Sequence, residues 1–306
     1  EEYFTATGRC AVKTQTGLVL ALKYHLSDNE RLTEQMLRKL LRDNKNKLNT
    51  GFVGTPLLCN VLTEHGMTDL AYRLLLNEEY PGWLHEVKLG ATTVWERWNS
   101  LDENGRISST GMNSLNHYSY GAVLEWIFRH VAGIDVTEQG PGGKMMRISP
   151  KVDHKLGSAS AVYDSASGCY RCGWQIENGD QITVTVTVPF GAKAQVILPY
   201  APDSVYHDTD NPLFETVENG ICCVKAGQYT VTYKAASPLK KSYSVDSTLE
   251  DLLAEPAIRA FLSNMMEVDM IPDLAYGLTL RQAAEAFAGG VSAEQAQRLN
   301  ALLEEF

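Results

Sequence analysis

The sequence predicts a multidomain protein of both α and β structure: a helical region, an antiparallel β-sandwich and a small helical appendage. Apolar residues recur at helical spacing up to about residue 135, then alternate with polar residues, and return to helical spacing from Thr248. A chain of 306 residues has room for two or three domains. We therefore expect one domain each at residues 1–135, 136–240 and 241–306.

The N-terminal region has the pattern of consecutive helices joined by short loops. The polar cluster at 27–30 has the composition of a helix N-cap with a carboxylate in the first turn. Paired helices followed by one long loop, from about 81 to 116, indicate an antiparallel helical array whose function lies in the loop. Helices are expected at residues 17–26, 32–41, 56–62, 69–76 and 118–131.

The middle region has the period of β-strands. Residues 181–188 alternate strictly between apolar and polar, as a half-buried strand does. The Asn-Gly-Asp turn signal at 178–180 separates that strand from another at 172–176, which predicts a hairpin. These strands indicate an antiparallel sandwich. Further strands are expected at residues 194–198, 214–217, 221–224 and 227–233.

The C-terminal region returns to amphipathic helical blocks at 250–253, 256–266 and 280–287. Ser292 is an N-cap candidate for a final helix that runs through Leu303. The region is expected to be a helical appendage with little core of its own.

Charge and cysteine content exclude several classes of protein. The formal net charge is −10 and no basic run interrupts it, so we expect neither a nucleic acid nor a membrane as partner. No secretory signal opens the chain, and the six cysteines do not form a disulfide framework, which together favour a cytoplasmic location. Because Glu1 leads straight into an apolar stretch, we also expect an upstream segment.

The loop from about 81 to 117 carries the residues suited to sugar chemistry. Aromatic faces stack on pyranose rings, and glycoside cleavage needs two carboxyl groups. Glu96 stands between Trp95 and Trp98 and next to Arg97. Apolar neighbours would raise its pKa and the arginine would lower it. From these residues alone, a surface ion pair beside core tryptophans is an equally good interpretation.

The cysteines offer a weaker hypothesis of a metal site. Cys169 and Cys172 form a CxxC pair, which together with Cys222 and Cys223 would supply thiolates for zinc. Adjacent residues of a strand point to opposite faces of the sheet, so at most one of Cys222 and Cys223 could take part. We therefore expect no metal and no cofactor.

Five motifs stand in order along the chain: Thr-Gly-Phe-Val-Gly-Thr-Pro at 50–56, Gly66 with Ala-Tyr-Arg-Leu at 71–74, Tyr-Pro-Gly-Trp at 80–83, Gly-Ala-Thr-Thr-Val-Trp-Glu-Arg-Trp at 90–98, and Ser-Thr-Gly-Met-Asn-Ser-Leu-Asn-His-Tyr-Ser-Tyr-Gly at 109–121. Together they resemble the motifs of the bacterial α-L-rhamnosidases, which are inverting six-hairpin glycosidases with a C-terminal β-sandwich. The resemblance covers about residues 1–235, and Gly-Ala-Thr-Thr-x-Trp-Glu-x-Trp followed by Asn-His-Tyr is specific to the family.

The resemblance implies a partial (α/α)6 barrel at residues 1–135 and hydrolysis of terminal α-L-rhamnose with inversion. It places the general base at Glu96 and a histidine that contacts the rhamnose hydroxyls at His117. A capping or core histidine is the alternative for His117. The sugar pocket would also include Asn116 and three tryptophans, for which core packing is the alternative: Trp83, Trp95 and Trp98.

The match lacks one part of the catalytic pair. The family's general acid lies in an upstream motif, Asp-x-x-x-Arg-x-x-x-x-Gly-Trp-x-Gly-Asp, which has no counterpart in this chain. Residues 1–135 also supply only about half of the twelve helices of such a barrel. We therefore expect the chain to be inactive by itself, and to be covered by the upstream half or by a second copy.

Two other functions remain open from the sequence. One is a six-hairpin glycosidase that acts on a different sugar. The other is a non-catalytic carbohydrate-binding or interaction module made of the sandwich and the appendage.

Overall fold

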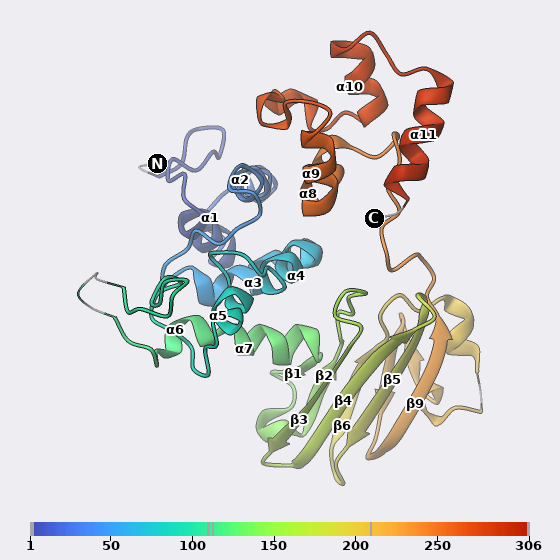
Figure 1. Ribbon diagram of the computed structural model, residues 1–306. Coiled ribbons are helices and arrows are strands. Elements are labelled where there is room, and N and C mark those ends of the chain that lie inside the picture. The colour runs from blue at the N-terminus through green and yellow to red at the C-terminus, as the bar shows by residue number, and fades with distance from the viewer. Residues whose placement is uncertain (1–2, 109–110, 112, 209, 305–306) are drawn as a thin grey trace. The chain divides into compact units, whose positions relative to one another are not determined.

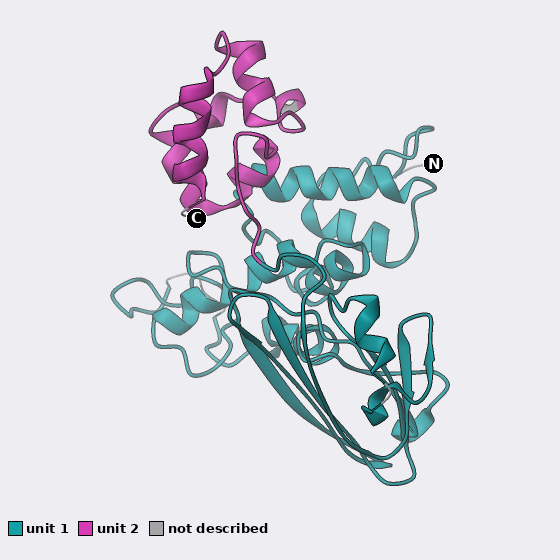
Figure 2. Ribbon diagram, turned by 90° about the vertical axis from the view of Figure 1, so that its right-hand side faces the viewer, with its two compact units in different colours: residues 1–239 teal, residues 240–306 magenta. Residues whose placement is uncertain are grey.

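The computed structural model describes residues 3–108, 111, 113–208 and 210–304. The chain folds into two compact units, Glu1–Leu239 and Lys240–Phe306 (Figure 2). The first unit holds the expected helical region and the expected sandwich, and the second holds the helical appendage (Figure 1). The division into three domains stays a prediction.

The first two helices begin where the sequence supplies N-caps. Thr14 accepts from the Gly17 amide at the start of α1, and Asn29 accepts from the Leu32 amide at the start of α2. This confirms the cap predicted in the cluster at 27–30. The helices are α1 (Gln15–Lys23), α2 (Glu30–Asp43), α3 (Thr55–Glu64), α4 (Thr68–Leu75), α5 (Trp83–Lys88), α6 (Tyr118–Gly121) and α7 (Val123–Trp126), followed by a π-helical turn (Ile127–Val131).

Two helical features differ from the prediction. The expected loop contains α5, whose six residues are too few to show helical periodicity. The expected helix at 118–131 is divided into α6, α7 and the π-helical turn. Gly121 lies at the first division, where a Cβ atom would come within 3.3 Å of the Val94 side chain. The loop that carries Val94 therefore lies close to the helix at this division.

The β region forms two sheets. One has the order β3-β4-β5-β9 and is antiparallel throughout. The other has the order β1-β2-β6-β8-β7, in which β2 and β6 run parallel. Alternation along a strand does not distinguish parallel from antiparallel neighbours, so the sequence did not show this pair. The strands are β1 (Ile134–Val136), β2 (Met145–Ile148), β3 (Ser158–Ser165), β4 (Gly168–Glu177), β5 (Gln181–Val188), β6 (Lys193–Ile197), β7 (Val217–Glu218), β8 (Ile221–Val224) and β9 (Gly227–Lys234).

The alternating residues of the strands fill the space between the sheets. On β5 the buried side chains are those of Ile182, Val184, Val186 and Val188. The hairpin predicted at 178–180 is confirmed: it joins β4 to β5, with Asn178 and Gly179 in the left-handed region. The strand expected at 214–217 is instead a 3-10 turn that ends at Phe214, followed by β7.

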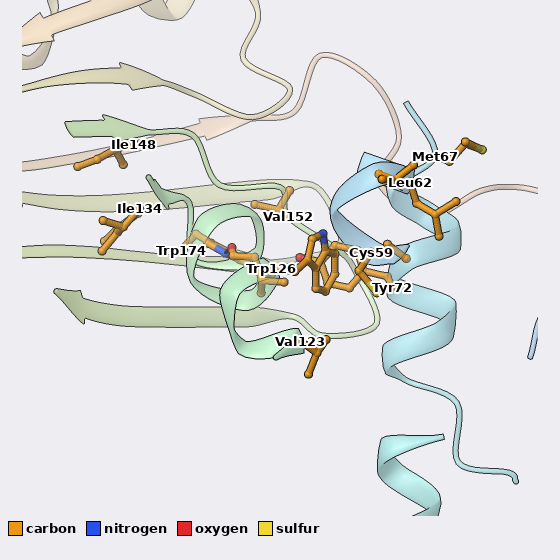
Figure 3. Close-up of a cluster of buried hydrophobic side chains, with 14 of the residues drawn as sticks. Cys59, Leu62, Met67, Tyr72, Val123, Trp126, Ile134, Ile148, Val152 and Trp174 are labelled. Atoms are coloured by element: carbon orange, nitrogen blue, oxygen red, sulfur yellow. Dashed lines mark hydrogen bonds between the residues drawn. The ribbon is translucent and has the colours of Figure 1, made fainter. Parts of the chain in front are cut away.

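The helices and the sandwich share one hydrophobic core (Figure 3). Trp126 is fully buried and lies edge-on to Tyr72, with ring centroids 5.2 Å apart. The Trp174 indole of β4 donates to the Val131 carbonyl at 2.7 Å, and the Tyr72 hydroxyl donates to the Lys151 carbonyl. The sandwich therefore packs directly against the helical region through Tyr72, Trp126 and Val131.

The second unit has a core of its own, contrary to the expectation of little core. Its fully buried side chains include Val245, Leu252, Ile258 and Leu303. Ser292 caps α11 in a capping box with Gln295, which confirms the predicted N-cap. The helices are α8 (Leu249–Ala254), α9 (Pro256–Ser263), α10 (Leu280–Phe287) and α11 (Ala293–Leu303).

Short 3-10 turns complete the chain, and none of the helices in its described part is long and apolar enough to cross a membrane. The turns are Pro141–Gly143, Asp203–His207, Pro212–Phe214, Val268–Met270 and Asp273–Ala275.

Candidate functional site

Two loop segments that are far apart in the sequence lie side by side and carry the main candidate residues. The Glu96 amide donates to the Ser114 carbonyl at 2.9 Å, and the His117 amide donates to the Val94 carbonyl at 2.8 Å. The Thr93 hydroxyl donates to a carbonyl of the same opposing segment. The segments 93–96 and 114–117 therefore run in opposite directions, which brings Glu96 and His117 into one site.

The Glu96 side chain is buried and is held by the backbone of the opposing segment. It is 9% exposed, and its Oε2 accepts from the Ser114 amide at 2.7 Å. Among the described residues, Oε1 has no hydrogen-bond partner. The surface ion pair with Arg97 is therefore wrong as an interpretation. A carboxylate with one oxygen fixed and the other available is suited to take a proton from a water molecule.

His117 caps α6 and also stacks between two aromatic rings. Its Nδ1 accepts from the Ser119 amide at 3.3 Å, so the neutral ring carries its hydrogen on Nε2. The ring lies 4.8 Å from that of Phe52 and 5.4 Å from that of Tyr118, both stacked. The cap uses one nitrogen and leaves Nε2 as a donor, so capping and sugar contact are compatible. The contact with sugar stays a prediction.

The three tryptophans are packed against the protein rather than open to solvent. Trp95 is 2% exposed, Trp98 is 7% exposed and Trp83 is 9% exposed. Trp98 stacks on Tyr120 with centroids 4.0 Å apart, and Trp83 meets Trp98 edge-on. The Trp83 indole donates to the Tyr120 carbonyl at 3.0 Å. The core-packing alternative describes these contacts, and a role in lining a sugar pocket stays a prediction.

The exposed aromatic side chains beside the site were not among the predicted residues. Phe52 is 44% exposed and Tyr118 is 86% exposed. Both lie within motifs that carry the family resemblance, and this was the signal that could have found them. Asn116, which was predicted, is exposed and bonds through its backbone to Ser114.

Glu86 on α5 is a second buried carboxyl group that sequence reasoning missed. It is 3% exposed, its Oε2 accepts from the Trp95 amide at 3.4 Å, and its Oε1 has no partner among the described residues. Burial raises the pKa of Glu86 to about 7, and the bond from Trp95 opposes that rise. The available signal was its spacing of three residues from Trp83, which places both on one helix face.

A further pair of hydrogen bonds closes the loop. The fully buried Ser100 donates to the Asn113 Oδ1 at 2.6 Å, and the Asn113 amide group donates back to the Ser100 carbonyl at 3.0 Å. This ties the segment after Glu96 to the segment before Ser114. Three residues of the same motif, Ser109, Thr110 and Met112, lie outside the described residues.

The described residues contain no group of three or more histidine, cysteine or carboxylate side chains placed to hold a metal ion. In the sandwich, Cys222 is buried and Cys223 is exposed, as adjacent strand positions require. Burial raises the pKa of the Cys172 thiol to about 12, so this side chain is a neutral thiol near neutral pH.

Two models of known families match the chain. Residues 1–131 match the bacterial alpha-L-rhamnosidase 6 hairpin glycosidase domain, and residues 133–211 match the bacterial alpha-L-rhamnosidase C-terminal domain. The chain belongs to the bacterial α-L-rhamnosidase family. It includes the part of the six-hairpin domain that holds Glu96 and His117, and the C-terminal domain that packs against it.

Individual relatives are much longer than this chain. An alpha-L-rhamnosidase of Alteromonas sp. is 39% identical over 221 residues, which are 71% of this chain and 23% of that protein. One from Formosa agariphila is 39% identical over 208 residues, 67% of this chain and 22% of that protein. This chain also matches the structure of Streptomyces avermitilis alpha-L-rhamnosidase complexed with L-rhamnose, with a TM-score of 0.68 and 33% sequence identity. The matched region includes 76% of this chain and 22% of the Streptomyces avermitilis chain. The chain thus spans less than a quarter of these relatives' length.

Proposed function

We propose that this chain carries the base-bearing part of an α-L-rhamnosidase active site, which removes terminal non-reducing α-L-rhamnose from glycosides. The geometry of Glu96 is the observation that carries the proposal: a buried carboxylate, held at Oε2 by the Ser114 amide. The names of its relatives and the L-rhamnose bound to the Streptomyces avermitilis enzyme support the choice of sugar.

In the proposed reaction, Glu96 takes a proton from water as that water attacks the anomeric carbon. The second oxygen, Oε1, is the one available for this water. His117 donates from Nε2 to a sugar hydroxyl, while its Nδ1 stays bonded to the Ser119 amide. An enzyme that activates water on one face and protonates the leaving oxygen on the other inverts the anomeric configuration.

The leaving oxygen needs an acid on the opposite side of the sugar. Glu86 does not suit this role, because the side chain is 3% exposed and its free oxygen is closed off from solvent. We propose that the acid comes from an upstream segment of a longer protein, which also covers the exposed apolar side chains around the site. These side chains include Phe52, Val53, Tyr118 and Leu124.

The test compares the 306-residue chain with the longer in-frame coding product, using p-nitrophenyl α-L-rhamnoside and a panel of other p-nitrophenyl glycosides. The longer protein should hydrolyse the rhamnoside first to β-L-rhamnose, as followed by NMR. Glu96→Gln should lower its turnover by roughly 100- to 10,000-fold, the usual effect of losing a general base. The exposed Glu103 on the same loop supplies the control, and Glu103→Gln should leave turnover unchanged.

Three outcomes would contradict the proposal. One is full turnover by Glu96→Gln. Another is α-L-rhamnose as the first product, which indicates retention. A third is a faster reaction with another sugar of the panel. Strong activity from the 306-residue chain alone would contradict the part of the proposal that places the acid in an upstream segment. If that active chain is an obligate dimer, a second copy of the chain, rather than an upstream segment, covers the site.

We also propose a cytoplasmic location for the protein. All six cysteine thiols are free in the structure, which suits a reducing compartment. Fractionation of cells that produce the longer protein would test this, and recovery of the protein in the medium or the periplasm would contradict it.

A further inference from the structure

The segment that carries Glu96 is held on two opposite sides. On one side, the Val94 carbonyl and the Glu96 amide bond to the segment 114–117, with N–O distances of 2.8 and 2.9 Å. In such a strand-like pairing, successive amides point to opposite sides, so the Trp95 amide faces away from that segment. There it meets the Glu86 carboxylate, whose Oε2 lies 3.4 Å from the Trp95 nitrogen.

Burying the Glu86 carboxyl group at this contact costs free energy of folding. An apolar residue of similar size in α5 would pack without cost, whereas a buried carboxyl group with an unpartnered oxygen loses solvation. The side chain is 3% exposed, and its Oε1 has no hydrogen-bond partner in the described part of the chain. The placement of this group therefore serves the contact with Trp95 more than the stability of α5.

One tyrosine is influenced by both carboxyl groups. Burial raises the pKa of Tyr120, and Glu86, Tyr80 and Glu96 raise it further, while Arg97 lowers it. The backbone of Trp95 is the structural link between the two carboxyl groups, because its amide bonds to Glu86 and the next residue is Glu96.

We propose that Glu86 is a positioning residue for Glu96. Its carboxyl group holds the Trp95 peptide from the side opposite to Ser114 and so fixes the direction of the next side chain, that of Glu96. This role rests on the proposed function of Glu96 as the base, but the contact itself does not depend on any activity. The two parts can therefore be tested separately.

The contact is tested by NMR on the 306-residue chain. The Trp95 amide proton shift should titrate in the wild type with a midpoint near 7, because its acceptor changes charge there. In Glu86→Gln the same shift should stay flat between pH 5 and 9, since glutamine keeps the shape and the acceptor oxygen but does not ionise. Glu103→Gln should titrate like the wild type.

A Trp95 amide shift that is the same in the wild type and in Glu86→Gln at every pH between 5 and 9 would show that Glu86 does not hold this peptide. Glutamine has nearly the size and shape of glutamate, so Glu86→Gln is expected to fold like the wild type. This outcome would remove the positioning role whatever the activity of the longer protein.

The positioning role is tested by kinetics on the longer protein. The wild-type kcat should change with pH near 7, where Glu86 ionises, and this change should be absent in Glu86→Gln. Below that pH, kcat of Glu86→Gln should be within about threefold of wild type. Glu86→Met removes the acceptor at similar length, and should lower kcat by up to about 100-fold while KM changes little, because the base is misplaced. An unchanged kcat in Glu86→Met would overturn the role, and Glu86→Leu, which also lacks the acceptor, decides the question if Glu86→Met does not fold.

The two proposals fail in different ways. If the longer wild-type protein does not hydrolyse rhamnosides, the proposed function fails, and the NMR titration still decides the contact between Glu86 and Trp95. If hydrolysis depends on Glu96 but not on Glu86, the positioning role alone fails.

Discussion

The loop that carries Glu96 and the junction between the helices and the sandwich are built from similar residues with different results. In the junction, the polar atoms of the large aromatics are paired: the Trp126 indole donates to the Thr63 hydroxyl at 2.8 Å, and the Trp174 indole donates to the Val131 carbonyl at 2.7 Å. In the loop, three buried tryptophans are accompanied by two buried carboxyl groups, Glu86 and Glu96. Buried aromatics therefore occur with paired polar atoms in one place and with buried acidic groups in the other.

The comparison shows where stability and chemistry separate in this unit. Buried indoles whose N–H groups are hydrogen-bonded stabilise the folded state. A carboxyl group in a similar apolar setting costs stability and gains reactivity. Changes to the paired indoles of the junction should therefore act on the free energy of unfolding at any pH, and changes at buried titratable groups should act on its pH dependence.

The largest expected effect is at the junction. Trp126→Ala should lower the free energy of unfolding by about 3–5 kcal/mol, because it removes a fully buried indole and leaves a cavity. Urea denaturation followed by tryptophan fluorescence measures it, since all five tryptophans lie in the first unit. Leu124→Ala on the same helix, where the side chain is 57% exposed, is the control and should change stability by less than about 1 kcal/mol. Equal losses in the two variants would break the comparison.

The next effect is at Glu86 and depends on pH. Burial raises its pKa from 4.5 to about 7, so between these values the folded state binds more protons than the unfolded state. Wild-type stability should therefore fall as the pH rises through this window. Glu86→Gln should remove the fall and be more stable than wild type above pH 7, by up to about 3 kcal/mol at roughly 1.4 kcal/mol per pKa unit. Urea midpoints at pH 5 and pH 8 measure it, and a parallel pH dependence of the two proteins would contradict it.

His130 at the junction should show the opposite sign. Burial lowers its pKa from 6.5 to about 4, and Arg129 lowers it further, while Asp135 and Glu64 oppose this. Its Nε2 has no partner within the described residues. Stability should therefore be lost as the pH falls from 6.5 to 4, by about 2 kcal/mol once partial exposure is allowed for.

The variant His130→Gln tests this effect. It should lose that part of the pH dependence between pH 6.5 and 4 and keep the part that belongs to Glu86. If the wild type and His130→Gln change stability equally over this range, the neutral buried histidine is not the cause.

The smallest effect is in the second unit, which contains no tryptophan. Ser292→Ala removes the side-chain acceptor of the Gln295 amide at the start of α11 and should cost about 1 kcal/mol. Hydrogen exchange of residues 293–303, measured by mass spectrometry, follows this unit alone. Ser292→Asp keeps an acceptor and should exchange like wild type. Faster exchange in the first unit as well would show that the two units are coupled.

Much of the fold follows from local pattern. Helical spacing and the cap at Asn29 predicted α2, strict alternation predicted β5, and Ser292 predicted the start of α11. The short elements escaped prediction, because α5 and β1 contain too few residues to repeat a pattern. Which strands pair with each other was also not predicted, as the parallel pairing of β2 with β6 shows.

The site divides in the same way. The motif around Glu96 and His117 singled out both residues as candidates without any structure. The spacing of Glu86 from Trp83 places it on the same face of α5, but its contact with the Trp95 amide depends on how α5 and the loop pack together. The burial of the three tryptophans was also undecided, because the same residue type fills cores and lines sugar sites.

The sequence by itself determined the class of the fold, the helix caps, the main strands and the family, since these follow from spacing, from turn residues and from motifs that are contiguous in the chain. The tertiary structure decided which groups are buried and which atoms remain available. Burial and hydrogen bonding between the segments 93–96 and 114–117 depend on packing between distant parts of the chain. Those contacts bond Oε2 of Glu96 and leave its Oε1 without a hydrogen-bond partner among the described residues. They also place Glu86 against the amide of Trp95, the residue before Glu96.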